Sequence, residues 1–431
     1  MTAGVGSVAA GWRGGLGDGL RYGALGLPLA FVALPLYVVL PNHYAEAFGV
    51  PLATLGALLL AARLFDAVAD PWIGRLVDHG LSGPRTRLLA GMVVAAVALA
   101  LGFRGLFFPP VTDGPALLAW AAALLVLTYL AYSVLSVLHQ AWGARLGGGE
   151  GQRARIVSWR EGLALLGVMV ASVLPSLAGL GVATAVFAVA LAAGVGLLTV
   201  APRPQVDVPQ PPLPMTLPLR TPAFRRLLAI YLVNGIASAV PATLVLFFVR
   251  DRLQLPAWEP PFLAAYFAAG ALSMPLWVRA VARWGLARSW LAGMALAIAA
   301  FVWAATLGAG DGAAFLAVCV ATGVALGADL ALPGALLAGV VQRSGHQGRL
   351  EGAYFGWWNF ATKLNLALAA GIALPLLAAF GYTPGSRDDG ALNALTLAYC
   401  ALPCALKALA AALLWWRWIR HPDTVPEEIS R

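Results

Sequence analysis

Apolar runs of about 20 or more residues recur along this chain and constrain its fold more than any other feature. A helix rises 1.5 Å per residue, so about 20 residues cross the roughly 30 Å hydrocarbon core of a bilayer. The runs are continuous and do not alternate with a period of two, which excludes an outer-membrane barrel. Charged residues make up only 11% of the chain, against about 25% in soluble domains. We predict an all-α membrane protein with twelve transmembrane helices, near residues 21–41, 51–78, 88–108, 116–142, 158–179, 182–201, 225–249, 260–282, 288–308, 313–341, 351–380 and 391–418.

The twelve predicted helices fall into two groups of six. Residues 201–222 contain eight prolines and little hydrophobic periodicity, which is typical of an extended loop. We predict an N-terminal six-helix bundle at 1–200, a cytoplasmic linker at 201–222 and a C-terminal six-helix bundle at 223–431. Two six-helix bundles with a solute bound between them near the midplane form the major facilitator fold.

The basic residues are distributed unevenly over the predicted loops. With the N-terminus in the cytoplasm, only four of them fall in loops on the other side: Arg104, Arg250, Arg252 and Arg387. The positive-inside rule then predicts cytoplasmic N- and C-termini. We expect the membrane to be a bacterial inner membrane. The net charge of +9 follows from this topology, so no nucleic acid partner is expected. We expect a monomer in the lipid bilayer.

No catalytic motif stands out in the sequence. The chain lacks H-E-x-x-H, G-x-S-x-G and P-loop patterns and a His-rich cluster. We therefore expect a protein that is not an enzyme and needs no cofactor.

Three charged residues lie inside the second apolar run. Arg63, Asp66 and Asp70 are three and four residues apart, so they share one helical stripe. Charges within the membrane are costly and usually functional. We predict an ion-coupling site at Asp66 and Asp70; the alternative is an ion-pair cluster of these acids with Arg63 and loop arginines.

The same run carries a family resemblance. The segment 62–78 reads ARLFDAVADPWIGRLVD, and LRYG at 20–23, Tyr37, GRLEG at 348–352 and Lys363 accompany it. These motifs resemble the melibiose-type cation symporters, the glycoside-pentoside-hexuronide branch of the major facilitator superfamily. The resemblance implies a symporter whose cation site uses Asp66, Asp70 and the hydroxyl of Ser133, with Lys363 as a nearby charge.

The coupling ion is predicted from one missing ligand. Where the family often has Asn three residues after the first Asp, this chain has Ala69. Sodium prefers several oxygen donors, whereas a proton needs one carboxylate. We favour H⁺ over Na⁺, with a sodium ion at Asp66 and Asp70 as the alternative.

The predicted solute site departs from the family. Ala30 and Ser136 stand where family members have acids that accept sugar hydroxyls, while Arg160 matches a family arginine. We therefore expect an anionic or amphipathic solute and not an ordinary galactoside. The alternative is a lysophospholipid transporter of the same fold. The predicted cavity residues are Tyr37, Arg63, Ser136, His139, Arg160, Asp329 and Asn359.

Several of these residues have a structural alternative. Asp329 either lines the transport path or pairs with Lys363 or Lys407. His139 is either a proton relay or a helix-helix hydrogen-bonding group, and Asn359 either orients Lys363 or bonds a neighbouring helix. Lys407, near the end of the last helix, is expected to extend toward the membrane surface.

A cytoplasmic gate is predicted in the loop after the second run. Gly74, Asp78 and Arg85 belong to the pattern GRLVD followed by basic residues, which resembles the loop that the superfamily uses as a latch. Asp78 lies at the membrane edge, so it suits a latch better than an ion site.

Overall fold

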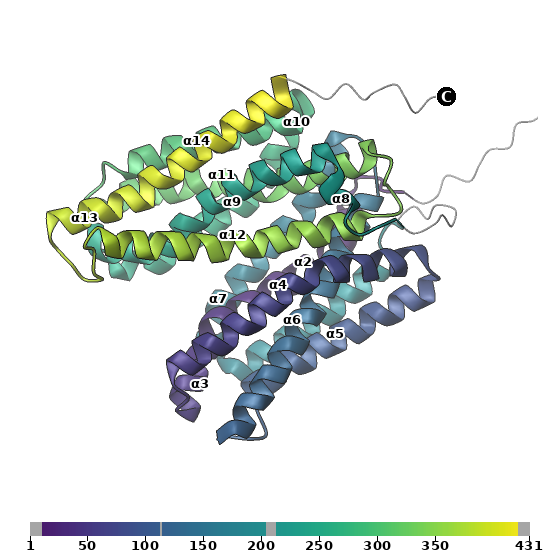
Figure 1. Cartoon of the computed structure of the whole chain (residues 1–431), viewed down its shortest axis with the longest axis horizontal. Coiled ribbons are helices and arrows are strands. Elements are labelled where there is room, and N and C mark those ends of the chain that lie inside the picture. The colour runs from purple at the N-terminus through teal and green to yellow at the C-terminus, as the bar shows by residue number, and fades with distance from the viewer. Residues whose placement is uncertain (1–10, 113, 204–212, 421–431) are drawn as a thin grey trace, which may run out of the picture. The chain divides into compact units, whose positions relative to one another are not determined.

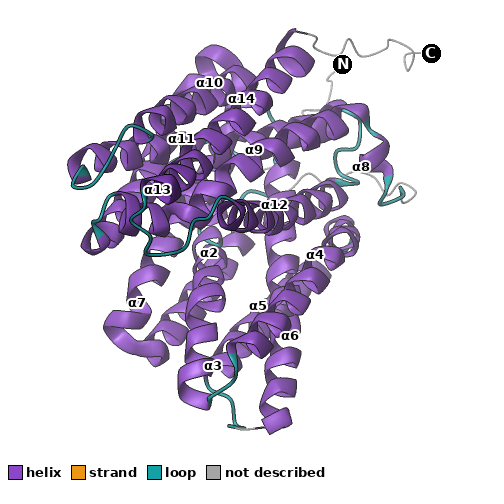
Figure 2. Cartoon of the chain, turned by 60° about the vertical axis from the view of Figure 1, so that its left-hand side comes forward, coloured by secondary structure: helices purple, strands orange, loops and turns teal. Residues whose placement is uncertain are grey.

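A computed structural model describes residues 11–112, 114–203 and 213–420. Every described segment is helix, turn or loop, without a strand (Figure 2). The helices of the N-terminal half are α1 (Leu16–Gly23), α2 (Gly26–Leu34), α3 (Leu40–Phe48), α4 (Leu52–Ser82), α5 (Arg85–Phe107), α6 (Gly114–Arg145) and α7 (Glu150–Thr199). A π-helical turn, Pro35–Val39, joins α2 to α3.

The C-terminal half is also helical. Its helices are α8 (Leu217–Arg220), α9 (Pro222–Phe247), α10 (Glu259–Ala304), α11 (Gly312–Arg343), α12 (Glu351–Ala379), α13 (Asp389–Thr396) and α14 (Leu402–Leu414). Short π-helical segments, Phe248–Arg252, Leu397–Ala401 and Trp415–Arg420, and a 3₁₀ turn, Pro256–Trp258, extend these helices.

Two helices are too long to be single spans. At 1.5 Å per residue, the 50 residues of α7 and the 46 of α10 would measure about 75 and 69 Å, more than twice the hydrocarbon thickness. Each is broken by a glycine with positive φ, Gly179 (φ 82°) in α7 and Gly285 (φ 78°) in α10. Only glycine adopts this conformation without strain, so each glycine makes a turn between two helices.

By length and composition, nine helices among the described residues can cross a membrane. The helix α4, with 31 residues, is not among them; it carries the charged stripe of Arg63, Asp66 and Asp70. The count of twelve spans stays a prediction.

The chain divides into two compact units. Unit 1 comprises residues 1–216 and 341–360, and unit 2 comprises 217–340 and 361–431. The segment 341–360, which holds the start of α12, thus belongs with the N-terminal helices. The predicted domain boundaries at 200 and 223 stay a prediction, and residues 204–212 of the predicted linker lie outside the described residues.

Each unit has its own apolar core. In unit 1, α2 packs along α7, and α6 packs against both α4 and α5 (Figure 1). In its interior Phe31 stacks on Phe187, and the ring of Phe103 packs against Phe187 at a tilt. In unit 2, Phe248, Phe315 and Tyr399 form the corresponding aromatic cluster. Burial of these rings supplies the packing that positions the polar residues described next.

Candidate functional site

The acidic stripe of α4 faces the interior of unit 1. Asp66 and Asp70 have exposed fractions of 4% and 0%, and they lie one turn apart on α4. The hydroxyl of Ser133, on α6, donates a hydrogen bond of 2.7 Å to Asp66 Oδ1. The structure therefore brings together three of the four residues predicted for cation coupling, within one unit.

Lys363, the fourth residue predicted for cation coupling, belongs to unit 2. Its proximity to Asp66 and Asp70 stays a prediction.

Arg63 begins the same stripe but does not share the burial of the acids. Its side chain is exposed, and its guanidinium carbon lies 3.9 Å from the centre of the Tyr37 ring. A cation over an aromatic face is held by the ring quadrupole. The stacking gives the Arg63 charge a defined position next to the acids.

Arg160 is paired with a residue that the sequence analysis missed. Its Nε and Nη2 donate to Glu161 Oε1 at 2.8 and 2.6 Å. Both donors use the same carboxylate oxygen, and Oε2 makes no hydrogen bond to the described part of the chain. An acid directly after an arginine inside an apolar run is the signal that could have identified Glu161 from the sequence.

His139 bonds to α1. Its Nε2 lies 2.7 Å from the carbonyl oxygen of Tyr22, and the Tyr22 hydroxyl donates to the carbonyl oxygen of His139 at 3.0 Å. Since a carbonyl only accepts, Nε2 carries a proton and donates. This reciprocal pair matches the helix-helix alternative for His139. On the same helix, Gln140 donates to the half-buried Ser136 at 3.4 Å.

The predicted cavity residue Asn359 is half-buried in the part of α12 that belongs to unit 1. It precedes Lys363 by one turn of helix.

Asp329 lies in a buried polar network of unit 2. Lys407 Nζ donates to Asp329 Oδ2 at 2.7 Å, to Asn234 Oδ1 at 2.9 Å and to Ser238 Oγ at 3.1 Å. Asp329 also accepts from Asn234 Nδ2, Ser238 Oγ and Trp290 Nε1 at 3.0, 3.1 and 2.9 Å. The network joins α9, α10, α11 and α14.

The expectation that Lys407 extends to the membrane surface is wrong. Its side chain is 4% exposed and ion-paired, because the network supplies the buried partners that an ammonium group otherwise finds only in water.

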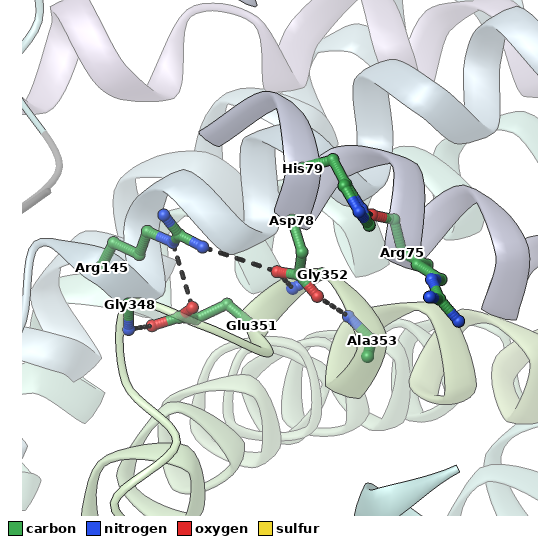
Figure 3. Close-up of polar contacts among 8 residues, drawn as sticks. All are labelled: Arg75, Asp78, His79, Arg145, Gly348, Glu351, Gly352 and Ala353. Carbon is green, nitrogen blue, oxygen red and sulfur yellow. Dashed lines mark hydrogen bonds and ion pairs between the residues drawn. The ribbon is translucent and has the colours of Figure 1, made fainter. Parts of the chain in front are cut away.

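The predicted gate residue Asp78 caps another helix. Its carboxylate accepts hydrogen bonds from the backbone N–H groups of Gly352 and Ala353, at 2.7 and 2.9 Å (Figure 3). These are two of the unpaired N–H groups in the first turn of α12, where the helix dipole also favours a negative charge. Asp78 therefore binds the start of α12 to the end of α4.

An arginine completes this cluster. Arg145, at the end of α6, bonds Glu351 at 3.0 Å and lies 3.6 Å from Asp78 (Figure 3). Glu351 in turn accepts from the Gly348 N–H at 2.6 Å. We call Asp78, Arg145, Glu351 and the first turn of α12 the latch cluster. Arg85 is engaged elsewhere, because it donates to the carbonyl oxygen of Thr199.

Two glycines allow the close crossing at the latch cluster. A Cβ atom on Gly74 would lie 2.2 Å from the carbonyl oxygen of Gly352, and the reverse is equally tight. Backbone cannot move aside as a flexible side chain can, so larger residues would separate α4 from α12.

A titratable residue lies close by in sequence. His346, between α11 and α12, has Nδ1 2.8 Å from the hydroxyl of Tyr354. Burial, and after it the charge of Arg349, lowers the pKa of His346 below its usual value.

The described part of the chain holds no group of three or more His, Cys, Asp or Glu side chains that could bind a metal ion. The acidic stripe thus offers two carboxylates and a hydroxyl as its possible cation ligands, together with any backbone oxygen.

Comparisons with known proteins add independent findings. A family model described as "MFS/sugar transport protein" matches residues 21–207 and 211–419. The chain is similar to a protein described as a candidate sulfoquinovose importer of Salmonella typhimurium, with 25% identity over 86% of this chain and 82% of that protein. It is also similar to the inner membrane symporter YicJ of Escherichia coli, with 29% identity over 37% of this chain and 33% of that protein.

Solved structures share the fold. A bacterial homologue of the iron transporter ferroportin, in an outward-facing state, has a TM-score of 0.68 at 17% identity, covering 92% of this chain and 98% of its own. The Escherichia coli fucose:proton symporter FucP has a TM-score of 0.67 at 13% identity, with coverage of 92% and 98%.

Proposed function

Since the chain belongs to the sugar transport family of the major facilitator superfamily, we propose that it is a cation-coupled symporter of a sugar-like solute. The family match confirms the resemblance and the all-α major facilitator fold predicted from the sequence. The chain is an integral multi-pass membrane protein and a transporter, not an enzyme.

One observation carries the coupling proposal, namely the buried Asp66–Ser133 hydrogen bond with Asp70 one turn away. In this proposal, a cation or proton neutralises the acids and lowers the electrostatic cost of closing the protein around its solute. Solute and ion then cross together by alternating access. Coupling arises because the empty, doubly charged carrier reorients slowly. The name of one relative, a candidate glycoside/cation symporter of Escherichia coli, supports this class of mechanism.

We favour the proton as the coupling ion. Ala69 contributes no oxygen to the stripe, which leaves Asp66, Asp70 and Ser133 as the side-chain donors proposed. A single carboxylate suffices to bind a proton, whereas sodium needs a fuller oxygen shell.

Vesicles containing the purified protein test the coupling. Asp66→Asn and Asp70→Asn are expected to abolish solute accumulation driven by an ion gradient while solute exchange at equal ion concentrations persists. Glu46→Gln, which changes an exposed acid of the same unit, is the matched control. Full gradient-driven accumulation by both Asp variants would overturn the assignment.

For the solute, we propose a sugar that carries a negative charge. Arg63, stacked on Tyr37, offers a positioned cation in unit 1. Ala30 and Ser136 stand where family members have acids that accept sugar hydroxyls. The Oε2 atom of Glu161, whose Oε1 is bonded to Arg160, offers an acceptor for a sugar hydroxyl in this chain. Two relatives that align with most of the chain are described as candidate importers of sulfoquinovose, an anionic sugar. Neither the family nor these relatives support the lysophospholipid alternative.

A panel of neutral, carboxylated and sulfonated sugars tests the solute class. We expect the sulfonated or carboxylated sugar to raise the melting temperature of the purified protein. In Arg63→Gln, the same rise should need about tenfold more of that sugar. Glu161→Gln should weaken the binding of every sugar that binds. A neutral sugar that stabilises wild type and Arg63→Gln equally, with no response to anionic sugars, would refute a charged solute.

We also propose that the latch cluster is the cytoplasmic gate. It fastens residues 341–360 to the N-terminal helices of unit 1, and α12 continues along the chain into unit 2. Asp78→Ala should increase hydrogen exchange in the first turn of α12, because the capped N–H groups lose their acceptor. Arg85→Gln, whose arginine bonds Thr199 instead, is the control. Unchanged exchange in Asp78→Ala would contradict a latch.

The remaining assignments follow from the same proposal. We place the protein in a bacterial inner membrane as a monomer, with both termini in the cytoplasm. Residues 1–10 and 421–431, at the two termini, lie outside the described residues.

A further inference from the structure

A cavity of about 160 Å³ lies within unit 2. Its walls come from α9, α10, α11, α14 and the π-helical segment before α14. Five aromatic side chains form much of this wall: Phe262, Tyr266, Phe267, Phe301 and Tyr399. Cavities of about 150 Å³ with apolar walls bind benzene in other proteins. The size thus suits one six-membered ring.

The charged residues at this cavity compensate each other. Asp329 and Lys407 both line it, and their ion pair measures 2.7 Å. Lys407 directs all three of its N–H donors within the network, and each carboxylate oxygen of Asp329 accepts two hydrogen bonds. An ionised ligand would find no uncompensated charge there and would lose its hydration. A neutral ligand is therefore favoured.

Two hydroxyl groups remain available to a ligand. Tyr266 and Tyr399 line the cavity, and neither hydroxyl bonds to another residue in the described part of the chain. A phenolic hydroxyl both donates and accepts, so it matches a ligand with a single hydroxyl. A sugar carries several hydroxyls, and this mainly apolar wall would leave most of them without partners.

We propose that this cavity binds one neutral phenol, with its ring among the aromatic side chains and its hydroxyl bonded to Tyr266 or Tyr399. The site belongs to unit 2 and shares no residue with the acidic stripe of unit 1, so it does not depend on the proposed transport function. Burial of an apolar ring supplies the affinity, and the tyrosine hydroxyls favour phenol over benzene.

Thermal unfolding of the purified full chain with phenol itself as the probe tests the site. We expect the melting temperature to rise with the logarithm of phenol concentration. Ala325→Leu adds volume at a buried wall residue and should abolish the rise. Ala317→Leu, at an exposed position on the same helix, is the matched control and should retain it. An equal rise in wild type and Ala325→Leu would overturn the proposal, since phenol would then act through the detergent.

A second readout remains informative if Ala325→Leu fails to fold. Cys319 lines the cavity, whereas Cys404 is partly exposed and does not. Phenol at ten times its dissociation constant should slow alkylation of Cys319 about tenfold, by occupancy, and leave Cys404 unchanged in peptide-resolved mass spectrometry. Tyr266→Phe combined with Tyr399→Phe should weaken phenol but not benzene. An alkylation rate of Cys319 that phenol does not change overturns the site.

Discussion

The hydrogen bond from Ser133 to Asp66 provides a test that separates the two possible coupling ions. Ser133→Ala removes the hydroxyl and leaves the two helices in place, because alanine keeps the Cβ atom. Both partners are buried, with exposed fractions of 1% and 4%, and the bond is 2.7 Å long. Water therefore cannot readily replace the lost donor.

The expected magnitude follows from the charge of the acceptor. A hydrogen bond to a charged group contributes about 1.5–3 kcal/mol, and about 1.4 kcal/mol corresponds to a factor of ten. The serine hydroxyl stabilises the negative charge on Asp66, so its loss should change the ion dependence of transport by about tenfold to a hundredfold. In a proton symporter, the pH of half-maximal transport moves up by about one to two units.

A sodium symporter responds in the opposite sense. The serine oxygen is then a ligand of the ion, and its loss should weaken the apparent sodium affinity by about tenfold. Proton coupling therefore predicts that Ser133→Ala changes the pH dependence of transport. Sodium coupling predicts that it changes the sodium dependence.

The assay is solute uptake into vesicles, measured across pH at fixed sodium and across sodium at fixed pH. Ser133→Thr keeps the hydroxyl and should behave as wild type. Ser158→Ala removes a buried serine hydroxyl that has no hydrogen-bond partner in the described part of the chain, and it controls for general loosening. If Ser133→Ala changes neither the pH profile nor the sodium dependence, Asp66 is not the coupling group.

Three further predictions concern stability. Lys407→Met leaves the Asp329 carboxylate, whose side chain is only 12% exposed, without its counter-charge and should lower stability by about 3–5 kcal/mol in denaturant unfolding. The double variant with Asp329→Leu should lose less than the sum of the two single variants, and additive losses would contradict a coupled pair. The pKa of His346 is lowered in the folded protein, so wild-type stability should fall as the pH drops below about 6.5. His346→Gln should flatten this decline, and an unchanged slope would refute the assignment. Gly352→Ala should lower stability by about 1–3 kcal/mol, whereas Gly91→Ala, whose Cβ would meet nothing within 4 Å, should not.

Local features of the chain were readable from the sequence. The apolar runs predicted the helices, because backbone N–H and C=O groups in hydrocarbon find no water and a helix pairs them within one segment. The spacing of Asp66 and Asp70 placed them on one stripe, because helix geometry depends only on near neighbours. Motif resemblance then pointed to Ser133, which the structure places 2.7 Å from Asp66.

Partners distant in the chain required the tertiary structure. Asp78 and Gly352 are 274 residues apart, and nothing in the neighbourhood of Asp78 specifies that its acceptor atoms meet the start of α12. Arg145 and Glu351 are also remote from each other, 206 residues apart in the sequence. Such pairings depend on how α4, α6 and α12 pack, which a single sequence does not record.

Lys407 illustrates the same division between local and tertiary information. Its position near the end of an apolar run predicted that the Lys407 side chain extends toward the membrane surface, where water would solvate the ammonium group. The folded unit instead surrounds it with Asn234, Ser238 and Asp329 from other helices. The sequence by itself determined that this chain is a helical membrane transporter with an acidic stripe, because those properties follow from residues close together. Packing decided which charges are compensated, since compensation depends on distances between atoms that the chain brings together only when it folds.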